Sequence, residues 1–130
     1  MPSAILPSLP VELAYLALCA PLALAYIVAQ TVLSGGHGRR QPGDEWTGRA
    51  FRAEKALRNF METFPLFAAL ALAITVAGKA DWWSGLGAAL YFWARVAYLP
   101  AYILDYGPLR STIWSVSLIG IAILCWQLAF

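Results

Sequence analysis

Polar and ionisable side chains recur at helical spacing within two otherwise apolar parts of the sequence. The first row has intervals of three and four residues, and its members are Arg52, Lys55, Asn59 and Glu62. The second row has the same intervals, and its members are Tyr91, Arg95, Tyr98, Tyr102 and Asp105. Side chains three or four residues apart share one face of a helix. Each row therefore predicts a polar stripe on one helix, and Arg58 is placed to pair with Glu62.

The residue types in these rows predict a site for a small charged ligand. Glu62 and Asp105 are opposed by a larger group of cations, which are Arg52, Lys55, Arg58, Arg95 and Arg110. Guanidinium groups bind carboxylates through paired hydrogen bonds, whereas a carboxylate can accept an ammonium group. We therefore expect a pocket for a zwitterionic molecule with net negative charge. A simpler alternative is that Arg95 pairs with Glu62 only to neutralise two buried charges and fix the helix register.

The composition indicates what kind of fold must hold these rows. Of the 130 residues, 61% are hydrophobic and 12% are charged, against about 45–50% and about 25% in a typical soluble domain. Cys19 and Cys125 lie in apolar runs, and nine Lys and Arg barely exceed seven Asp and Glu. These features argue against a soluble domain, a secreted disulfide scaffold and a nucleic-acid-binding domain. The chain is expected to be an integral membrane protein with no nucleic-acid partner.

Four apolar runs are long enough to cross a hydrocarbon core of about 30 Å, which requires roughly 20 residues. They cover residues 11–33, 60–77, 82–104 and 111–130. The second helix is expected to begin in water, about four turns before its apolar run, with Asp44 or Thr47 as its cap. The sequence thus predicts one domain, residues 1–130, with an all-α fold built as a bundle of four transmembrane helices.

The distribution of basic residues predicts the orientation in the membrane. The stretch between the first two spans holds six of the nine basic residues, namely Arg39, Arg40, Arg49, Arg52, Lys55 and Arg58, whereas the link on the opposite side holds only Lys79. The positive-inside rule then places the loop 34–59 in the cytosol and both termini on the other side. Residue usage rich in Ala, Trp and Arg points to a bacterial inner membrane.

The sequence shows no pattern for a metal site or a hydrolase. His37 is the single histidine, and neither cysteine has a ligand partner at a metal-binding spacing. No metal is therefore expected. The glycines around His37 match no phosphate-binding motif.

Three segments carry a family resemblance. They are RNFMETFPLF at 58–67, RVAYLPAY at 95–102 and PLRS at 108–111. In this order, on a chain with four spans, they resemble the MAPEG superfamily (membrane-associated proteins in eicosanoid and glutathione metabolism). The resemblance is closest to the branch of microsomal prostaglandin E synthases and microsomal glutathione transferases. It implies a homotrimer of four-helix subunits that binds glutathione between neighbouring subunits on the cytosolic side.

The resemblance also implies roles for single residues. Positions that match the family's glutathione ligands are Arg58, Asn59, Glu62, Arg95, Tyr98 and Tyr102, with Lys55 where an arginine is usual. Arg110 and Ser111 match the pair beside the glutathione sulfur. With Tyr98 these two residues are the expected catalytic set, and Arg52 completes the expected binding row on the second helix.

These roles predict a glutathione-dependent membrane transferase, or a peroxidase or isomerase that uses the same thiolate. Glutathione is the expected co-substrate, and the electrophile is a lipophilic molecule that arrives from the surrounding lipids. A guanidinium beside the sulfur would lower the thiol pKa from its usual value near 8.5, so that more of the nucleophilic thiolate is present at neutral pH.

Two alternatives remain open from the sequence. Family enzymes carry an arginine near the cytosolic end of the first helix, whereas here Gln30 is polar and no arginine precedes Arg39. This departure favours a catalytically silent protein that binds lipid or glutathione. The second alternative is a small multidrug transporter, which would need a carboxylate at mid-membrane depth in a largely uncharged bundle. Glu62 instead lies among several cations near one face of the membrane.

Overall fold

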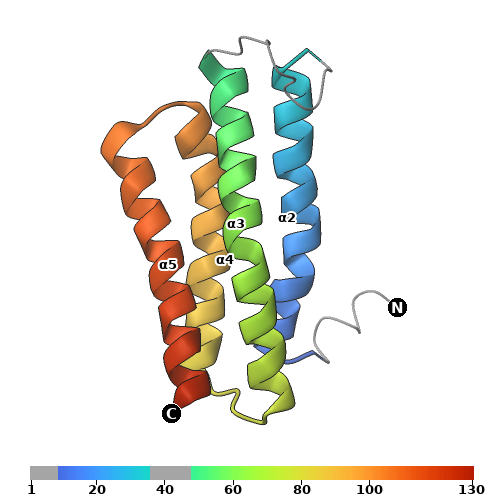
Figure 1. Cartoon of the computed structure of the whole chain (residues 1–130), viewed down its shortest axis with the longest axis vertical. Helices are drawn as coiled ribbons and strands as arrows, with labels where there is room; N and C mark the ends of the chain where they lie inside the picture. The colour runs from blue at the N-terminus through green and yellow to red at the C-terminus, as the bar shows by residue number, and fades with distance from the viewer. Residues whose placement is uncertain (1–8, 36–47) are drawn as a thin grey trace.

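The computed structural model describes residues 9–35 and 48–130, which form antiparallel helices packed side by side (Figure 1). The helices are α2 (Val11–Leu33), α3 (Gly48–Val76), α4 (Trp82–Ile103) and α5 (Gly107–Ala129). Neither described segment contains a strand. The predicted all-α bundle of four helices is confirmed.

Three of the helices, α2, α3 and α5, are long and apolar enough to cross a membrane. Helix α4 has a matching length of 22 residues, but polar side chains such as Ser84 and Arg95 lower its hydropathy. Both of these side chains are fully buried against the other helices. Large apolar side chains lie instead on the outer surface, where Val76 is 87% exposed. Such an extended apolar exterior is typical of a surface that faces lipid.

Two helix boundaries bear on the candidate site. Helix α3 is already helical at Gly48, and its expected caps, Asp44 and Thr47, lie outside the described residues. Helix α5 begins at Gly107, before the expected apolar run at residue 111, because proline is well accommodated in the first turn of a helix. Arg110 therefore belongs to the first turn of α5 and not to the connection that precedes it.

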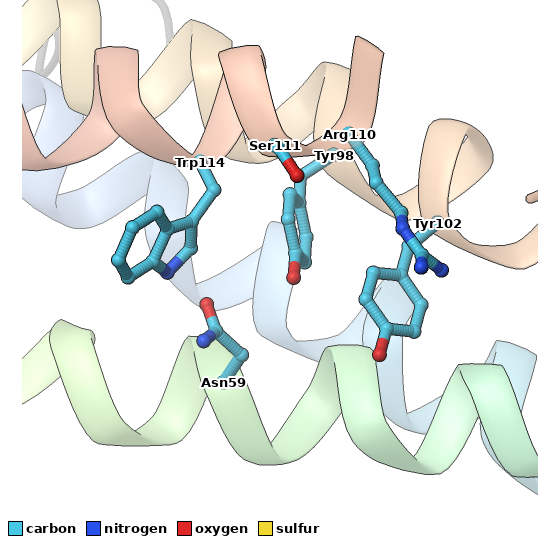
Figure 2. Close-up of a pocket in the computed structure, with 6 residues that line it drawn as sticks. All are labelled: Asn59, Tyr98, Tyr102, Arg110, Ser111 and Trp114. Carbon is cyan, nitrogen blue, oxygen red and sulfur yellow. The ribbon is translucent and has the colours of Figure 1, made fainter. Parts of the chain in front are cut away.

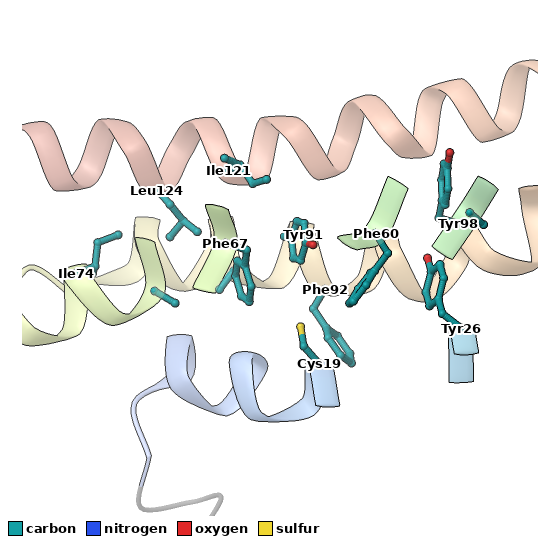
Figure 3. Close-up of a cluster of buried hydrophobic side chains, with 13 residues drawn as sticks. Cys19, Tyr26, Phe60, Phe67, Ile74, Tyr91, Phe92, Tyr98, Ile121 and Leu124 are labelled. Carbon is teal, nitrogen blue, oxygen red and sulfur yellow. The ribbon is translucent and has the colours of Figure 1, made fainter. Parts of the chain in front are cut away.

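The α3–α4 pair forms the centre of the bundle, and α2 and α5 pack on its opposite sides. Aromatic rings fill the interior, as Figure 3 shows. Tyr26 stacks on Phe60 with ring centres 4.8 Å apart, and Phe67 stacks on Tyr91 at 4.4 Å. Helix association within lipid depends on such close packing, because apolar surface gains little by moving from lipid to protein.

The two ends of the bundle differ in charge. At one end, called here the basic end, α2 and α4 finish and α3 and α5 begin, and the cations of α3 gather there together with Arg110. At the other end, called the Asp81 end, the described charged residues are Glu12, Lys79 and Asp81. The buried Glu12 carboxylate accepts a hydrogen bond from Ser84, which joins α2 to α4.

Asp81 caps α4, and its removal should destabilise the bundle. Its carboxylate accepts a hydrogen bond from the Ser84 backbone N–H at 3.1 Å, and Ser84 Oγ accepts one from the Asp81 N–H at 2.8 Å. Its second carboxylate oxygen accepts a hydrogen bond from Gln127 at 2.9 Å. We expect Asp81→Ala to lower the free energy of unfolding by about 1–2 kcal/mol, measured by thermal unfolding in detergent. Asp81→Asn keeps one acceptor oxygen, which can still accept from the Ser84 N–H but cannot also accept from Gln127, so it should lose less stability than Asp81→Ala. Equal loss in the two variants would contradict this role.

Candidate functional site

A cleft opens at the basic end between α3, α4 and α5. One part has a volume of about 240 Å³ and is lined by Asn59, Tyr98, Tyr102, Arg110, Ser111 and Trp114. An adjoining part of about 200 Å³ is lined by Lys55, Arg58, Asn59, Glu62, Tyr98 and Tyr102. The two parts share Asn59, Tyr98 and Tyr102, so we treat them as one site, named the basic-end cleft. Figure 2 shows Trp114 of α5 pointing toward Asn59 of α3, and Arg110 of α5 beside the Tyr102 ring.

Helix α3 supplies the charged wall of this cleft. Lys55, Asn59 and Glu62 lie on one face of α3, as their spacing predicts, and all three line the cleft. The expected Arg58–Glu62 pair is wrong, because Arg58 instead binds Glu54 at 3.0 Å. An acidic residue four positions before a basic one is the better arrangement on a helix, which explains this choice. The Glu62 carboxylate is thus exposed and has no ion-pair partner among the described residues.

Helix α5 brings Arg110 to the opposite wall. The Arg110 guanidinium lies 4.9 Å from the centre of the Tyr102 ring and donates a hydrogen bond to Asp105 at 3.0 Å. Asp105 has a φ of 60°, the left-handed conformation in which the chain turns between α4 and α5. Ring and carboxylate together fix the guanidinium at the mouth of the cleft, one residue from Ser111.

Arg95 lies beneath the cleft and does not line it. Its side chain is fully buried, over the rings of Tyr91 and Tyr98, and donates a hydrogen bond to Asn59 Oδ1 at 2.6 Å. Its Nε and Nη2 atoms have no hydrogen-bond partner among the residues that the structure describes. Arg95 therefore does not pair with Glu62, as the simpler alternative required. Because Asn59 Oδ1 accepts from Arg95, the amide nitrogen of Asn59 is left as a donor.

Two further polar residues lie apart from the cleft. Arg52 was expected to bind the ligand, but its Nε donates a hydrogen bond at 2.8 Å to the backbone oxygen of Ile103. Ile103 is the last residue of α4. A cation that meets the free carbonyls at a helix end stabilises that end. Gln30, where the resemblance leads us to expect an arginine, is buried, and its Nε2 has no hydrogen-bond partner within residues 9–35 and 48–130. Neither residue lines the cleft.

Trp114 also lines the cleft, although it belongs to neither polar row and to none of the segments that carry the resemblance. Trp114 lies three residues after Ser111 and four after Arg110, hence on the same face of α5. This spacing was the signal that could have revealed it. The indole lies one turn deeper along α5 than Arg110, on the side from which an apolar molecule would enter.

The electrostatics of the cleft suit an anion that also carries an ammonium group. Lys55, Arg58 and Arg110 line the walls, and Glu62 is the carboxylate that lines them. Hydroxyl groups of Tyr98, Tyr102 and Ser111 add neutral hydrogen-bonding groups. The described residues contain no group of three or more His, Cys, Asp or Glu that could hold a metal ion.

Comparison with known protein families decides the relationship of the chain. The model of the MAPEG family matches residues 11–130, which include all four helices. The chain belongs to the MAPEG family. No curated protein and no solved structure matches it. The assignment is thus to the family as a whole, and the resemblance to the prostaglandin E synthase and glutathione transferase branch stays a prediction.

The geometry brings together the three segments that carry the family resemblance. Residues 58–67 of α3, 95–102 of α4 and 108–111 of α5 come from three helices and meet at the basic end. Of the residues expected to bind or act, only Arg52 and Arg95 lie outside the lining of the cleft.

Proposed function

We propose that this MAPEG protein is a glutathione-dependent transferase of the membrane. The observation that carries the proposal is the basic-end cleft itself, in which Asn59, Tyr98 and Tyr102 connect the part lined by Arg110 and Ser111 with the part lined by the charged residues of α3. In this assignment the glutathione carboxylates lie against Lys55 and Arg58, and its ammonium group lies against Glu62. Asn59 and Tyr102 hold the peptide groups through neutral hydrogen bonds.

The proposed chemistry is activation of the glutathione thiol. A free thiol has a pKa near 8.5, so a cation beside the sulfur increases the fraction of thiolate at neutral pH. Arg110 is the cation in place, and Ser111 and Tyr98 offer hydroxyl donors to the sulfur. The thiolate attacks an electrophilic carbon, a carbon–sulfur bond forms, and the leaving group departs with its electron pair while the thiol proton passes to water. Peroxide reduction and isomerisation would begin with the same thiolate.

Trp114 and the surrounding lipid define the other substrate. The indole forms the membrane-side wall of the cleft, 39% exposed. An apolar electrophile that diffuses in the bilayer reaches the sulfur past this wall without crossing water. We therefore assign lipophilic electrophiles as the second substrate class.

The proposal includes the assembly and the orientation of the protein. The cleft is open on the outside of a single subunit, where the Arg58 side chain is 61% exposed. A neighbouring subunit in a homotrimer would cover this charged surface and shield it from lipid. The excess of cations at the basic end supports a cytosolic location for that end in an inner membrane, with both termini on the opposite side.

Ligand-dependent stability tests the proposed function. We expect millimolar glutathione to stabilise the detergent-purified protein against heat, because a ligand at 100 times its dissociation constant contributes about 2.7 kcal/mol. The same preparation should conjugate glutathione to chlorodinitrobenzene. The matched control is the tripeptide with serine in place of cysteine, which should stabilise the protein but give no product.

Two results would contradict the proposal. Absence of stabilisation by either tripeptide would show that the cleft does not bind glutathione. Stabilisation without turnover of aryl halides, epoxides or organic hydroperoxides would support the catalytically silent alternative.

A further inference from the structure

A second cavity lies at the Asp81 end, on the far side of the bundle from the basic-end cleft. It has a volume of about 260 Å³ and is lined by Trp83, Ile123, Trp126 and Gln127. Its walls come from the start of α4 and the end of α5, which lie side by side in Figure 1. Both tryptophans stand at helix ends, the depth at which lipid headgroups meet the hydrocarbon. This cavity is therefore within reach of a headgroup.

The charges around this cavity favour a cation. Asp81 is exposed, and α5 ends here with free carbonyl groups, which carry partial negative charge. The one described cation nearby, Lys79, donates through Nζ to the Leu128 carbonyl at 2.8 Å and is engaged there. The two indole rings add a cation-binding surface, since an ammonium group is attracted to the face of tryptophan.

Gln127 favours a primary ammonium group over a trimethylated one. Its Nε2 donates to the Lys79 carbonyl and to the Asp81 carboxylate, both at 2.9 Å, so both amide hydrogens are used. The carboxamide oxygen remains as an acceptor in the lining of the cavity. An acceptor favours an ammonium that carries N–H groups over a trimethylated one, which has none.

We propose that this cavity binds the headgroup of phosphatidylethanolamine. The primary ammonium lies between the Trp83 and Trp126 rings and donates to the Gln127 oxygen, with Asp81 as the nearby counter-charge. The indole N–H groups of both tryptophans make no hydrogen bond within the described residues and can donate to the lipid phosphate. An anionic headgroup such as phosphatidylglycerol would be repelled by Asp81. This site is independent of the glutathione proposal, because the two cavities share no residue.

Lipid-dependent thermal unfolding of the full chain in dodecyl maltoside tests the site. Dioleoyl phosphatidylethanolamine, phosphatidylcholine and phosphatidylglycerol are added at increasing mole fraction. We expect the ethanolamine lipid to raise the unfolding midpoint at a mole fraction about tenfold lower than either of the other two lipids. Trp126→Leu and Trp83→Leu should each weaken this response about tenfold, and Trp126→Phe, which keeps a ring, should weaken it less.

Trp82→Phe is the matched control for Trp126→Phe. Trp82 has almost the same exposure as Trp126, 69% against 66%, and does not line the cavity. Its ring packs edge-to-face on Trp83 with centres 5.0 Å apart, and phenylalanine keeps a ring at this contact. We expect the Trp82 variant to respond to lipid as the unmodified protein does. Equal weakening in the Trp82 and Trp126 variants would overturn the proposal in favour of a general aromatic belt. An equal or stronger response to phosphatidylcholine or phosphatidylglycerol would overturn the assignment of a primary ammonium.

Discussion

Arg110→Ala should abolish most glutathione conjugation while glutathione binding is largely retained. Without the guanidinium beside the sulfur, the pKa of bound glutathione should rise by about one to two units, which corresponds to about 1.4–2.7 kcal/mol of lost thiolate stabilisation. The turnover rate at neutral pH should then fall about 10- to 100-fold. Because the thiolate returns as pH rises through the higher pKa, the loss should shrink in alkaline buffer.

Glu62→Ala should show the opposite pattern. Glu62 lines the cleft at the α3 wall and has no ion-pair partner in the described part of the chain, so its carboxylate is available to the ligand ammonium. Removing a hydrogen bond to a charged group costs about 1.5–3 kcal/mol, a loss of about 10- to 100-fold in affinity. The turnover rate at saturating glutathione should change little, since Glu62 is not assigned to the sulfur.

For both variants, the thermal shift with glutathione measures binding, and the pH dependence of turnover measures the pKa of the bound thiol. Arg110→Lys is the control for charge, because it keeps the cation and loses the planar group that lies over Tyr102. We expect it to keep a lowered thiol pKa and part of the turnover. If Arg110→Ala and Glu62→Ala each lost binding and turnover to the same extent, the division of roles would be wrong.

The number of helices could be predicted from the apolar runs, and most of the cleft residues on α3 and α4 from the spacing of the polar rows. Spacing did not predict Trp114, and it wrongly placed Arg52 and Arg95 in the cleft. The apolar runs predict how many helices there are and roughly where they lie, because each must cross the same thickness of hydrocarbon. Polar rows at intervals of three and four residues predict which side chains share one helix face, because those intervals follow the turn of a helix. Lys55, Asn59 and Glu62 accordingly lie together, as do Tyr98 and Tyr102 on the neighbouring helix.

Partners between distant residues could not be predicted. Arg52 and Ile103 are 51 positions apart, and their hydrogen bond depends on where α4 ends beside α3. The depth of Arg95 depends likewise on how closely three helices surround it, which a single row cannot reveal. Spacing on one helix fixes the direction of a side chain, whereas burial and partner are set by the packing of other helices.

Local order along the helix explains the remaining difference at Arg58. Glu54 and Glu62 are both four positions away, so spacing alone allows either partner. The dipole of the helix and the direction of the side chains favour the acidic residue on the N-terminal side. That preference leaves Glu62 available within the cleft, which is the arrangement a ligand ammonium needs.

Helices α4 and α5 approach each other closely at Gly87 and Gly120, so we expect a side chain added at Gly120 to have a large effect on stability. A Cβ atom on Gly120 would lie 2.6 Å from the Gly87 carbonyl oxygen and 2.8 Å from the Tyr91 backbone nitrogen. Both obstacles are backbone atoms, so neither can move without displacing α4. We expect Gly120→Ala to destabilise the protein by about 3 kcal/mol and to lower the unfolding midpoint by about 10 °C.

Gly120→Ala should also reduce activity, although Gly120 lies well away from the basic-end cleft. The cleft is formed where α5 carries Arg110 opposite α4 and α3, and a displacement of about 1 Å from the productive geometry can cost about 100-fold in rate. Gly85→Ala is the matched control on α4, because among the described residues its Cβ would meet only the Val11 side chain, at ordinary distances of 3.7 and 4.0 Å. That variant should be neutral or slightly more stable, since alanine favours a helix more than glycine does. Thermal unfolding and glutathione conjugation are measured for both variants, and only Gly120→Ala should lose stability and activity. Equal tolerance of both alanines would show that α4 and α5 do not meet at Gly87 and Gly120, and the geometry assigned to Arg110 would fall with that contact.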